Sequence, residues 1–196
     1  MKAVKIAALV FALTAVAVAG ERVLLWPDGK MPDAQPQQVA AMLEEQQAPG
    51  FNPDEHRAPY IEWLAPPAKP NGTCMILISG GGYHRLADFI HVKTWNKRFT
   101  AIGCQCVNLV YRTPRPQGIE IWRTAWEDGQ RAVRLVRSMA AKRGFNPEKI
   151  GAMGCSAGSH LSVMLATSSQ TPAYAPVDDL DKTPCHINWA IPFCPA

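Results

Sequence analysis

The chain of 196 residues is 47% apolar, 18% charged and 8% aromatic, which excludes a disordered polypeptide, because such chains are poor in apolar residues and rich in charge of one sign. Its 17 prolines and 14 glycines are too few for a low-complexity or collagen-like chain, and its length indicates one domain that can bury a core. The net charge of +4 is not gathered in a basic run, so neither nucleic acid nor an anionic membrane is an expected partner.

The beginning of the chain has the pattern of a secretory signal peptide. Met1–Lys5 is a short positive region, and Ile6–Val18 is an uncharged apolar run that is too short to span a bilayer. Ala17–Ala19 then offers the small residues of a cleavage site. An uncleaved anchor helix or a buried helix is the alternative. We predict a signal peptide over 1–19, a mature protein that begins near Gly20, and a secreted or periplasmic location with no membrane partner after cleavage.

The predicted mature chain begins with a polar lead-in and continues as one α/β domain. Residues 20–58 are rich in proline, glutamine and glutamate, with a short helical pattern around Val39–Gln47. Over 59–196, strand and helix patterns alternate. Strands are expected at 58–64, 73–79, 105–111, 150–153 and 187–193, and helices at 86–102, 120–143 and 157–168. Continuously apolar strands are typical of strands buried on both faces, so we predict a mainly parallel sheet with helices on both faces.

Two groups of charged residues lie in the second half of the chain. Three arginines recur at helical spacing in the predicted helix 120–143: Arg131, Arg134 and Arg137. A phosphate-binding stripe is one interpretation, and a solvated helix face is the favoured one. The three aspartates of the loop before the last predicted strand are likewise expected to be solvated turn residues: Asp178, Asp179 and Asp181.

The six cysteines do not form the framework of a small disulfide-rich scaffold. Cys74, Cys104 and Cys106 lie in largely apolar runs, where a free thiol behaves as a small hydrophobe. A pair between Cys185 and Cys194 is left open, because sequence does not fix connectivity. Neither a CxxC pair nor an HxxxH spacing is present, so we predict no structural zinc, no other metal and no cofactor.

The first motif with a chemical meaning is Gly154-Cys155-Ser156-Ala157-Gly158, which lies between a predicted strand and a predicted helix. Acyl transfer needs a hydroxyl held on a sharp strand-to-helix turn, and small flanking residues let the backbone make that turn. The alternative is a glycine-lined helix start with Ser156 as its N-cap. We predict that Ser156 is a nucleophile on such a turn.

The second motif, Ser79-Gly80-Gly81-Gly82-Tyr83, also follows a predicted strand directly. Three glycines let backbone N–H groups approach a ligand closely and point at one oxygen. A flexible turn is one alternative, and a phosphate cradle is the other, but the Gly-Lys-Ser/Thr that opens a phosphate-loop helix is missing here. The motif therefore predicts an oxyanion hole that faces Ser156.

The order of these pieces resembles that of secreted α/β-hydrolase esterases, close to the acetyl-xylan-esterase-like and hormone-sensitive-lipase-like groups. The resemblance covers residues 24–196 and rests on these segments: Leu25–Pro27, Leu77–Tyr83, Val110–Arg112, Asp128–Arg134, Ile150-Gly151 and Gly154–Leu161. It implies an α/β-hydrolase fold with Ser156 as nucleophile. It also implies an oxyanion hole formed by the N–H of Ala157 with N–H groups of Gly81, Gly82 or Tyr83. Ser79 departs from the pattern, because many lipase relatives carry histidine there as an anchor for the loop.

The triad order of this superfamily places the catalytic acid and then the histidine after the nucleophile. Only residues 157–196 follow Ser156. His160, one helical turn further on, is expected to be structural, and His186 precedes the last predicted strand at its wrong end. The other three histidines lie upstream of the nucleophile: His56, His84 and His91. We therefore predict a hydrolase fold without its C-terminal strands, an exposed edge on the last strand, and weak turnover by this chain alone.

The predicted function is hydrolysis of carboxylic esters through an acyl-Ser156 intermediate. The resemblance implies a small-molecule or polysaccharide ester as the substrate, with acetyl groups on carbohydrate as the favoured form. Two other classes stay open: a non-catalytic, truncated hydrolase-like binding protein, and an exported serine peptidase of the same fold.

Overall fold

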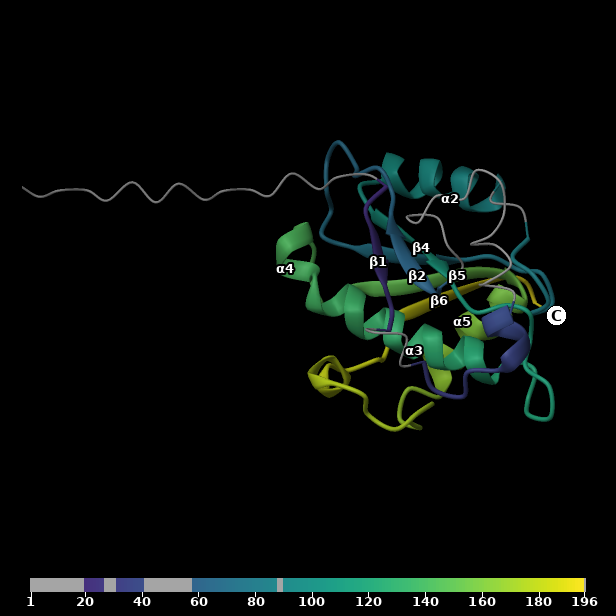
Figure 1. Cartoon of the computed structure of the whole chain (residues 1–196). Coiled ribbons are helices and arrows are strands. Elements are labelled where there is room, and N and C mark those ends of the chain that lie inside the picture. The colour runs from purple at the N-terminus through teal and green to yellow at the C-terminus, as the bar shows by residue number, and fades with distance from the viewer. Residues whose placement is uncertain (1–19, 27–30, 41–57, 88–89, 196) are drawn as a thin grey trace, which may run out of the picture.

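The computed structural model describes residues 20–26, 31–40, 58–87 and 90–195 (Figure 1). The predicted signal peptide and most of the predicted helix at Val39–Gln47 lie outside these residues. Within them, no helix is long and apolar enough to cross a membrane.

A single six-stranded sheet forms the centre of the described structure, in the order β1-β2-β4-β3-β5-β6. Its strands are β1 Arg22–Leu24, β2 Tyr60–Trp63, β3 Cys74–Ile78, β4 Gln105–Val110, β5 Ile150–Ser156 and β6 Trp189–Pro195. β1 and β2 are antiparallel to their neighbours, whereas β4, β3, β5 and β6 run parallel. This confirms the predicted mainly parallel sheet. The sequence did not predict β1, because three residues are too few to show a period.

Helices cover both faces of the sheet, as predicted. α2 (Ile90–Ala101) lies on one face, and α3 (Arg123–Ser138) and α5 (Ala157–Thr167) lie on the other (Figure 1). The predicted helix 120–143 is in fact two helices, because α4 (Ala140–Arg143) begins again after Met139. A short 3-10 helix, η3 (Asp179–Lys182), lies in the loop before β6.

Each face of the sheet has its own apolar core. Ile76 of β3 packs in the larger core with Val133 of α3 and Leu161 of α5. Leu77, the next residue of β3, packs on the opposite face with Trp95 of α2. Successive strand side chains point to opposite faces, so a strand between two helical layers has to be apolar throughout. Every residue of β3 and β4 is buried, which explains the unbroken apolar run of β3; in β4 the buried residues include the polar Gln105 and Asn108.

The last strand, β6, lies at the edge of the described sheet. Ile191 and Phe193 are 38% and 45% exposed. This agrees with the predicted exposed edge. All six cysteines are free thiols, so Cys185 and Cys194 do not form the pair that the sequence left open.

A buried carboxylate joins the lead-in, β4 and α3. Asp128 of α3 is 0% exposed. It accepts hydrogen bonds from the indole N–H of Trp26 at 2.7 Å and from the backbone N–H of Arg112 at 2.8 Å. The Nε of Arg112 donates to the same carboxylate at 3.0 Å. Arg112 itself is 2% exposed, so each of these two buried charges is compensated only by such contacts.

The interpretation of the three arginines of α3 as a solvated face is wrong. Arg131 is 2% exposed and binds Asp178 with both Nη nitrogens, at 2.7 and 2.6 Å. The other two donate to backbone carbonyls of the same loop, Arg134 to Thr183 at 3.1 Å and Arg137 to His186 at 2.8 Å. The loop between α5 and β6 crosses over this face of α3 and covers it. Helical spacing alone cannot show that a later segment will do so.

The aspartates of that loop are correspondingly not all solvated. The side chain of Asp181 is 2% exposed and lies 3.0 Å from Arg131. The hydrogen bonds from Arg131 hold the pKa of Asp178 below its ordinary value. Asp178 and Asp179 are both exposed, as expected of solvated turn residues, and the side chain of Asp179 is 93% exposed beside Lys182.

The Asp128 contacts predict a large stability effect. In an Asp128→Ala variant, the buried Arg112 loses one of its two carboxylate partners and Trp26 loses its acceptor, and we expect the free energy of unfolding to fall by about 3–5 kcal/mol. The measurement is urea unfolding followed by circular dichroism.

Asp179→Ala is the matched control, since it removes a carboxylate from an exposed ion pair with Lys182. Such pairs contribute only about 0–1 kcal/mol. Equal losses in the two variants would show that Asp128 is not a structural centre.

Candidate active site

Ser156 is the last residue of β5 and directly precedes α5. Its backbone has φ 53° and ψ −120°, a conformation that L-residues with a side chain rarely adopt. The structure therefore places the predicted strand–turn–helix elbow at this serine. The side chain of Ser156 makes no capping hydrogen bond to α5, so it does not act as the alternative N-cap.

Two glycines of the motif allow the elbow to form. A Cβ atom on Gly154 would lie 1.9 Å from the carbonyl oxygen of Gly158. A Cβ atom on Gly158 would lie 2.3 Å from the carbonyl oxygen of Ile78, at the end of β3. Only glycine fits both positions, because the backbone passes where a side chain would stand. The first turn of α5 is thereby pressed against the end of the neighbouring strand.

The backbone of the second motif also packs closely against the elbow, at Gly80. A Cβ atom on Gly80 would stand 3.1 Å from the Cβ of Ser156. The two motifs, 76 residues apart in sequence, therefore meet at the carboxyl ends of β3 and β5, as the parallel sheet predicts.

The loop from Gly80 to Tyr83 has an uncommon backbone. Gly81, Gly82 and Tyr83 all have positive φ, of 126°, 62° and 62°. The following turn is closed by the N–H of Ala87, which donates to the carbonyl of Gly80 at 2.8 Å. Among the described residues, none accepts a hydrogen bond from the N–H of Gly81, Gly82 or Tyr83. These N–H groups are therefore free to bind an oxyanion beside Ser156.

The side chain of Tyr83 connects this loop to α5. Its hydroxyl donates to the carbonyl of Ala157 at 2.9 Å and lies 2.8 Å from Nδ1 of His160. A carbonyl oxygen only accepts, so the Tyr83 proton goes to Ala157, and Nδ1–H of His160 donates to the phenol oxygen. Burial raises the pKa of Tyr83, which keeps this proton in place.

A second tyrosine anchors the start of the loop. Tyr111, at the end of β4, donates its hydroxyl proton to the carbonyl of Ser79 at 2.9 Å. Its ring packs edge-on against Tyr83, with 5.8 Å between ring centres. The two tyrosines thus supply the anchoring that the sequence expected to be lost with serine at position 79. The sequence analysis named Tyr83 only for its backbone N–H and did not predict the role of either hydroxyl, although Tyr83 follows the glycines directly and Tyr111 ends a predicted strand.

His160 and His186 have partners other than Ser156. His160 is held by Tyr83 rather than by Ser156. Nε2 of His186 lies 3.5 Å from a carboxylate oxygen of Glu148, in the segment before β6. Ser156 makes no side-chain hydrogen bond to any described residue, and the same residues contain no group of three metal-ligating side chains. Ala157 is the first residue of α5, so its N–H points toward the elbow from the helix start.

Comparison with known proteins agrees with this geometry. The family model BD-FAE matches residues 63–190. The chain is 32% identical over 125 residues to an acetylxylan esterase of Xylanibacter ruminicola, a match that covers 59% of this chain and 23% of the relative. It is 30% identical over 113 residues to endo-1,4-beta-xylanase B of Butyrivibrio fibrisolvens, covering 53% and 17%.

Solved structures share the fold. An acetyl ester-xyloside bifunctional hydrolase from Caldicellulosiruptor lactoaceticus superposes with a TM-score of 0.63 at 24% identity, over 89% of this chain and 57% of that one. Esterase 2 from Thermogutta terrifontis superposes with a TM-score of 0.59 at 26% identity, over 70% and 49%. The chain thus spans less than a quarter of the two curated relatives and about half of the two solved structures.

The Tyr83 contacts predict that the hydroxyl holds the loop to α5. In Tyr83→Phe, the buried carbonyl of Ala157 and Nδ1 of His160 lose their partner. We expect the free energy of unfolding to fall by about 1–3 kcal/mol. The measurement is urea unfolding of the variant beside the parent chain.

Tyr111→Phe is the natural comparison, because it removes a hydroxyl from the other anchor of the same loop. If both hydroxyls hold one loop, the double variant should lose less than the sum of the single losses, by at least about 0.5 kcal/mol. Strict additivity would show that the two anchors act on separate structures.

Proposed function

Because the chain belongs to the BD-FAE family of α/β-hydrolase esterases, we propose that it is a carboxylic-ester hydrolase with Ser156 as its nucleophile. The observation that carries this proposal is the elbow of Ser156 packed against Gly80 of the glycine loop. A hydroxyl presented on a strained turn, next to free N–H groups and a helix start, is what acyl transfer requires.

The proposed reaction has two steps. The Ser156 oxygen attacks the ester carbonyl carbon, and the electron pair of the C=O bond moves to the oxygen. The alcohol then leaves with the proton that Ser156 gave up, and an acyl-Ser156 ester remains. In the second step, water cleaves this ester and restores the hydroxyl. A general base has to carry the proton in both steps, and His160 is turned to Tyr83 instead.

The oxyanion of each step is proposed to lie between the N–H of Ala157 and N–H groups of Gly81, Gly82 or Tyr83. Donors of this kind are worth about 2.7–4 kcal/mol each when they are held in place before the reaction. The tyrosine hydroxyls fix the loop to α5 and to the end of β4, so the donors do not have to be reoriented when charge develops.

Acetyl esters of carbohydrate are the proposed substrates. This is supported by the similarity to the acetylxylan esterase and, at the level of fold, to the acetyl ester-xyloside hydrolase. A location outside the cytoplasm, reached through the signal peptide at 1–19, is proposed together with it.

The nucleophile can be tested without full turnover. We expect 4-nitrophenyl acetate to transfer its acetyl group to Ser156, and peptide mass spectrometry after an acid quench would locate the group. Ser156→Ala should lose this adduct completely, because the hydroxyl that accepts it is gone.

Ser159→Ala serves as the matched control. Ser159 is 0% exposed and its hydroxyl has no hydrogen-bond partner, so the variant removes a serine hydroxyl near the elbow without touching the reaction. It should be acetylated like the parent chain. A parent chain that is never acetylated at Ser156 would instead favour the non-catalytic binding protein.

A further inference from the structure

Two of the free thiols lie on neighbouring strands beside the elbow. Cys155 directly precedes Ser156 in β5, and Cys194 is the last residue but one of β6. The two strands run parallel and lie side by side (Figure 1). Cys155 is half-buried and Cys194 is exposed, whereas the other four cysteines are buried. These two thiols are therefore the ones that a reagent in solution can reach.

A bulge in β6 brings Cys194 opposite Cys155. Cys155 pairs with Phe193, and Ser156 pairs with Pro195, so Cys194 is the extra residue of β6 at this step. Its φ of 48° lies in the left-handed region, as in one common type of bulge. Neighbouring strands are about 4.8 Å apart and consecutive Cα atoms about 3.8 Å, which puts the two cysteine Cα atoms about 5–6 Å apart. A disulfide needs a separation of about 4.4–6.8 Å.

The side chains at this step face α2. Cys155 packs against the core that contains Trp95 of α2, and the ring centre of Phe193 lies 6.0 Å from that of Trp95. Strand residues alternate between the two faces, but the extra residue of a bulge interrupts this alternation. Burial raises the pKa of Cys155, and a negative charge on Cys194 raises it further. The two thiols thus interact across the strand pair.

The other four cysteines lie elsewhere in the fold. Cys185 belongs to the loop before β6 and donates its Sγ–H to the carbonyl of Ser169 at 3.4 Å. Cys104 and Cys106 lie at the start of β4, which β3 separates from β5. Cys74 of β3 packs in the core on the opposite face of the sheet. The arrangement therefore favours one pairing, between β5 and β6.

We propose that Cys155 and Cys194 are a redox-active pair, which a small-molecule disulfide such as oxidised glutathione converts into a disulfide bond that fastens β6 to the elbow. The exposed Cys194 thiolate attacks one sulfur of the small disulfide, whose S–S bond breaks and releases one thiolate. The Cys155 thiolate then attacks the Cys194 sulfur of the mixed disulfide and releases the second thiolate. Two cysteine thiols are oxidised, the small disulfide is reduced to two thiols, and the protons of the cysteines pass to the released thiolates.

The bond would act on the strand that has the fewest neighbours. β6 lies at the edge of the described sheet and pairs only with β5 there. The bond would close a long segment that contains α5 and the loop before β6, which removes conformational freedom from the unfolded chain. The proposed exported location is an oxidising environment, in which such a bond persists.

The test is oxidation of the whole folded chain with oxidised glutathione, followed by alkylation of the remaining thiols and peptide mass spectrometry. We expect peptides linked through Cys155 and Cys194 and a loss of two of the six thiols. The melting midpoint should rise by at least about 5 °C relative to the reduced chain. Dithiothreitol should reverse all three changes.

Cys194→Ser should show neither the linked peptides nor the rise in melting midpoint. Cys185→Ser is the matched control, since it removes another thiol while its hydroxyl can still donate to the carbonyl of Ser169. It should respond to oxidation like the parent chain, and circular dichroism should show that both reduced variants are folded.

Three results would overturn the proposal. One is a parent chain without the linked peptides, and another is a link found only between two chains on a non-reducing gel. The third is a melting midpoint that oxidation leaves unchanged, since the bond would then not fasten β6. The proposal does not depend on ester hydrolysis, so Ser156→Ala should form the bond like the parent chain. The two hypotheses therefore fail separately.

Discussion

The backbone of α5 approaches the end of β3 more closely than any side chain would allow, and the rest of the candidate site depends on this contact. A Cβ atom on Gly158 would lie 2.3 Å from the carbonyl oxygen of Ile78. Because the helix start touches the strand, Ser156 and the glycine loop that follows β3 become neighbours. A looser junction would separate the nucleophile from its oxyanion donors by the width of a side chain, and such donors act only within about 3 Å.

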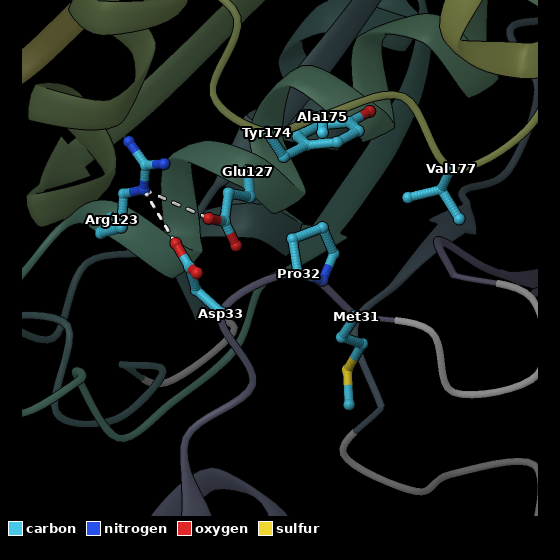
Figure 2. Close-up of a pocket in the computed structure, with 8 residues that line it drawn as sticks. All are labelled: Met31, Pro32, Asp33, Arg123, Glu127, Tyr174, Ala175 and Val177. Carbon is cyan, nitrogen blue, oxygen red and sulfur yellow. Dashed lines mark hydrogen bonds and ion pairs between the residues drawn. The ribbon is translucent and has the colours of Figure 1, made fainter.

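A buried ionic network holds the layer that supports this junction. Arg112 pairs with Asp128 and also with Glu127, and all three are nearly inaccessible to water. Removing such charges from water costs about as much as their attraction returns, so the network fixes positions more than it adds stability. One consequence is that Glu127 is held between Arg112, which donates to one of its oxygens, and Arg123, whose Nε lies 3.3 Å from the other (Figure 2).

The sequence predicted those parts of the fold that depend on the pattern of neighbouring residues. A continuous apolar run predicted β3 and a mostly apolar run predicted β4, and glycines at the ends of β3 and β5 predicted the loop and the elbow. It could not predict that the loop before β6 buries Arg131, because helical spacing describes one element and not what later covers it. The cavity lined by residues 31–33, by Arg123 and Glu127 of α3 and by the loop before β6 was not predicted for the same reason, since these three segments are separated by 90 and 47 residues along the chain and only the fold joins them.

The exchange of histidine for serine at position 79 shows which property of the glycine loop matters. The resemblance places a hydrogen-bonding anchor at this position, yet the side chain of Ser79 is buried without a partner. Its carbonyl is held by Tyr111, and the far end of the loop is held by Tyr83. The requirement is therefore that the loop backbone be fixed relative to α5, whichever side chain does so. Two buried phenols meet it in this chain, because each donates its proton to a backbone carbonyl that lies across the loop junction.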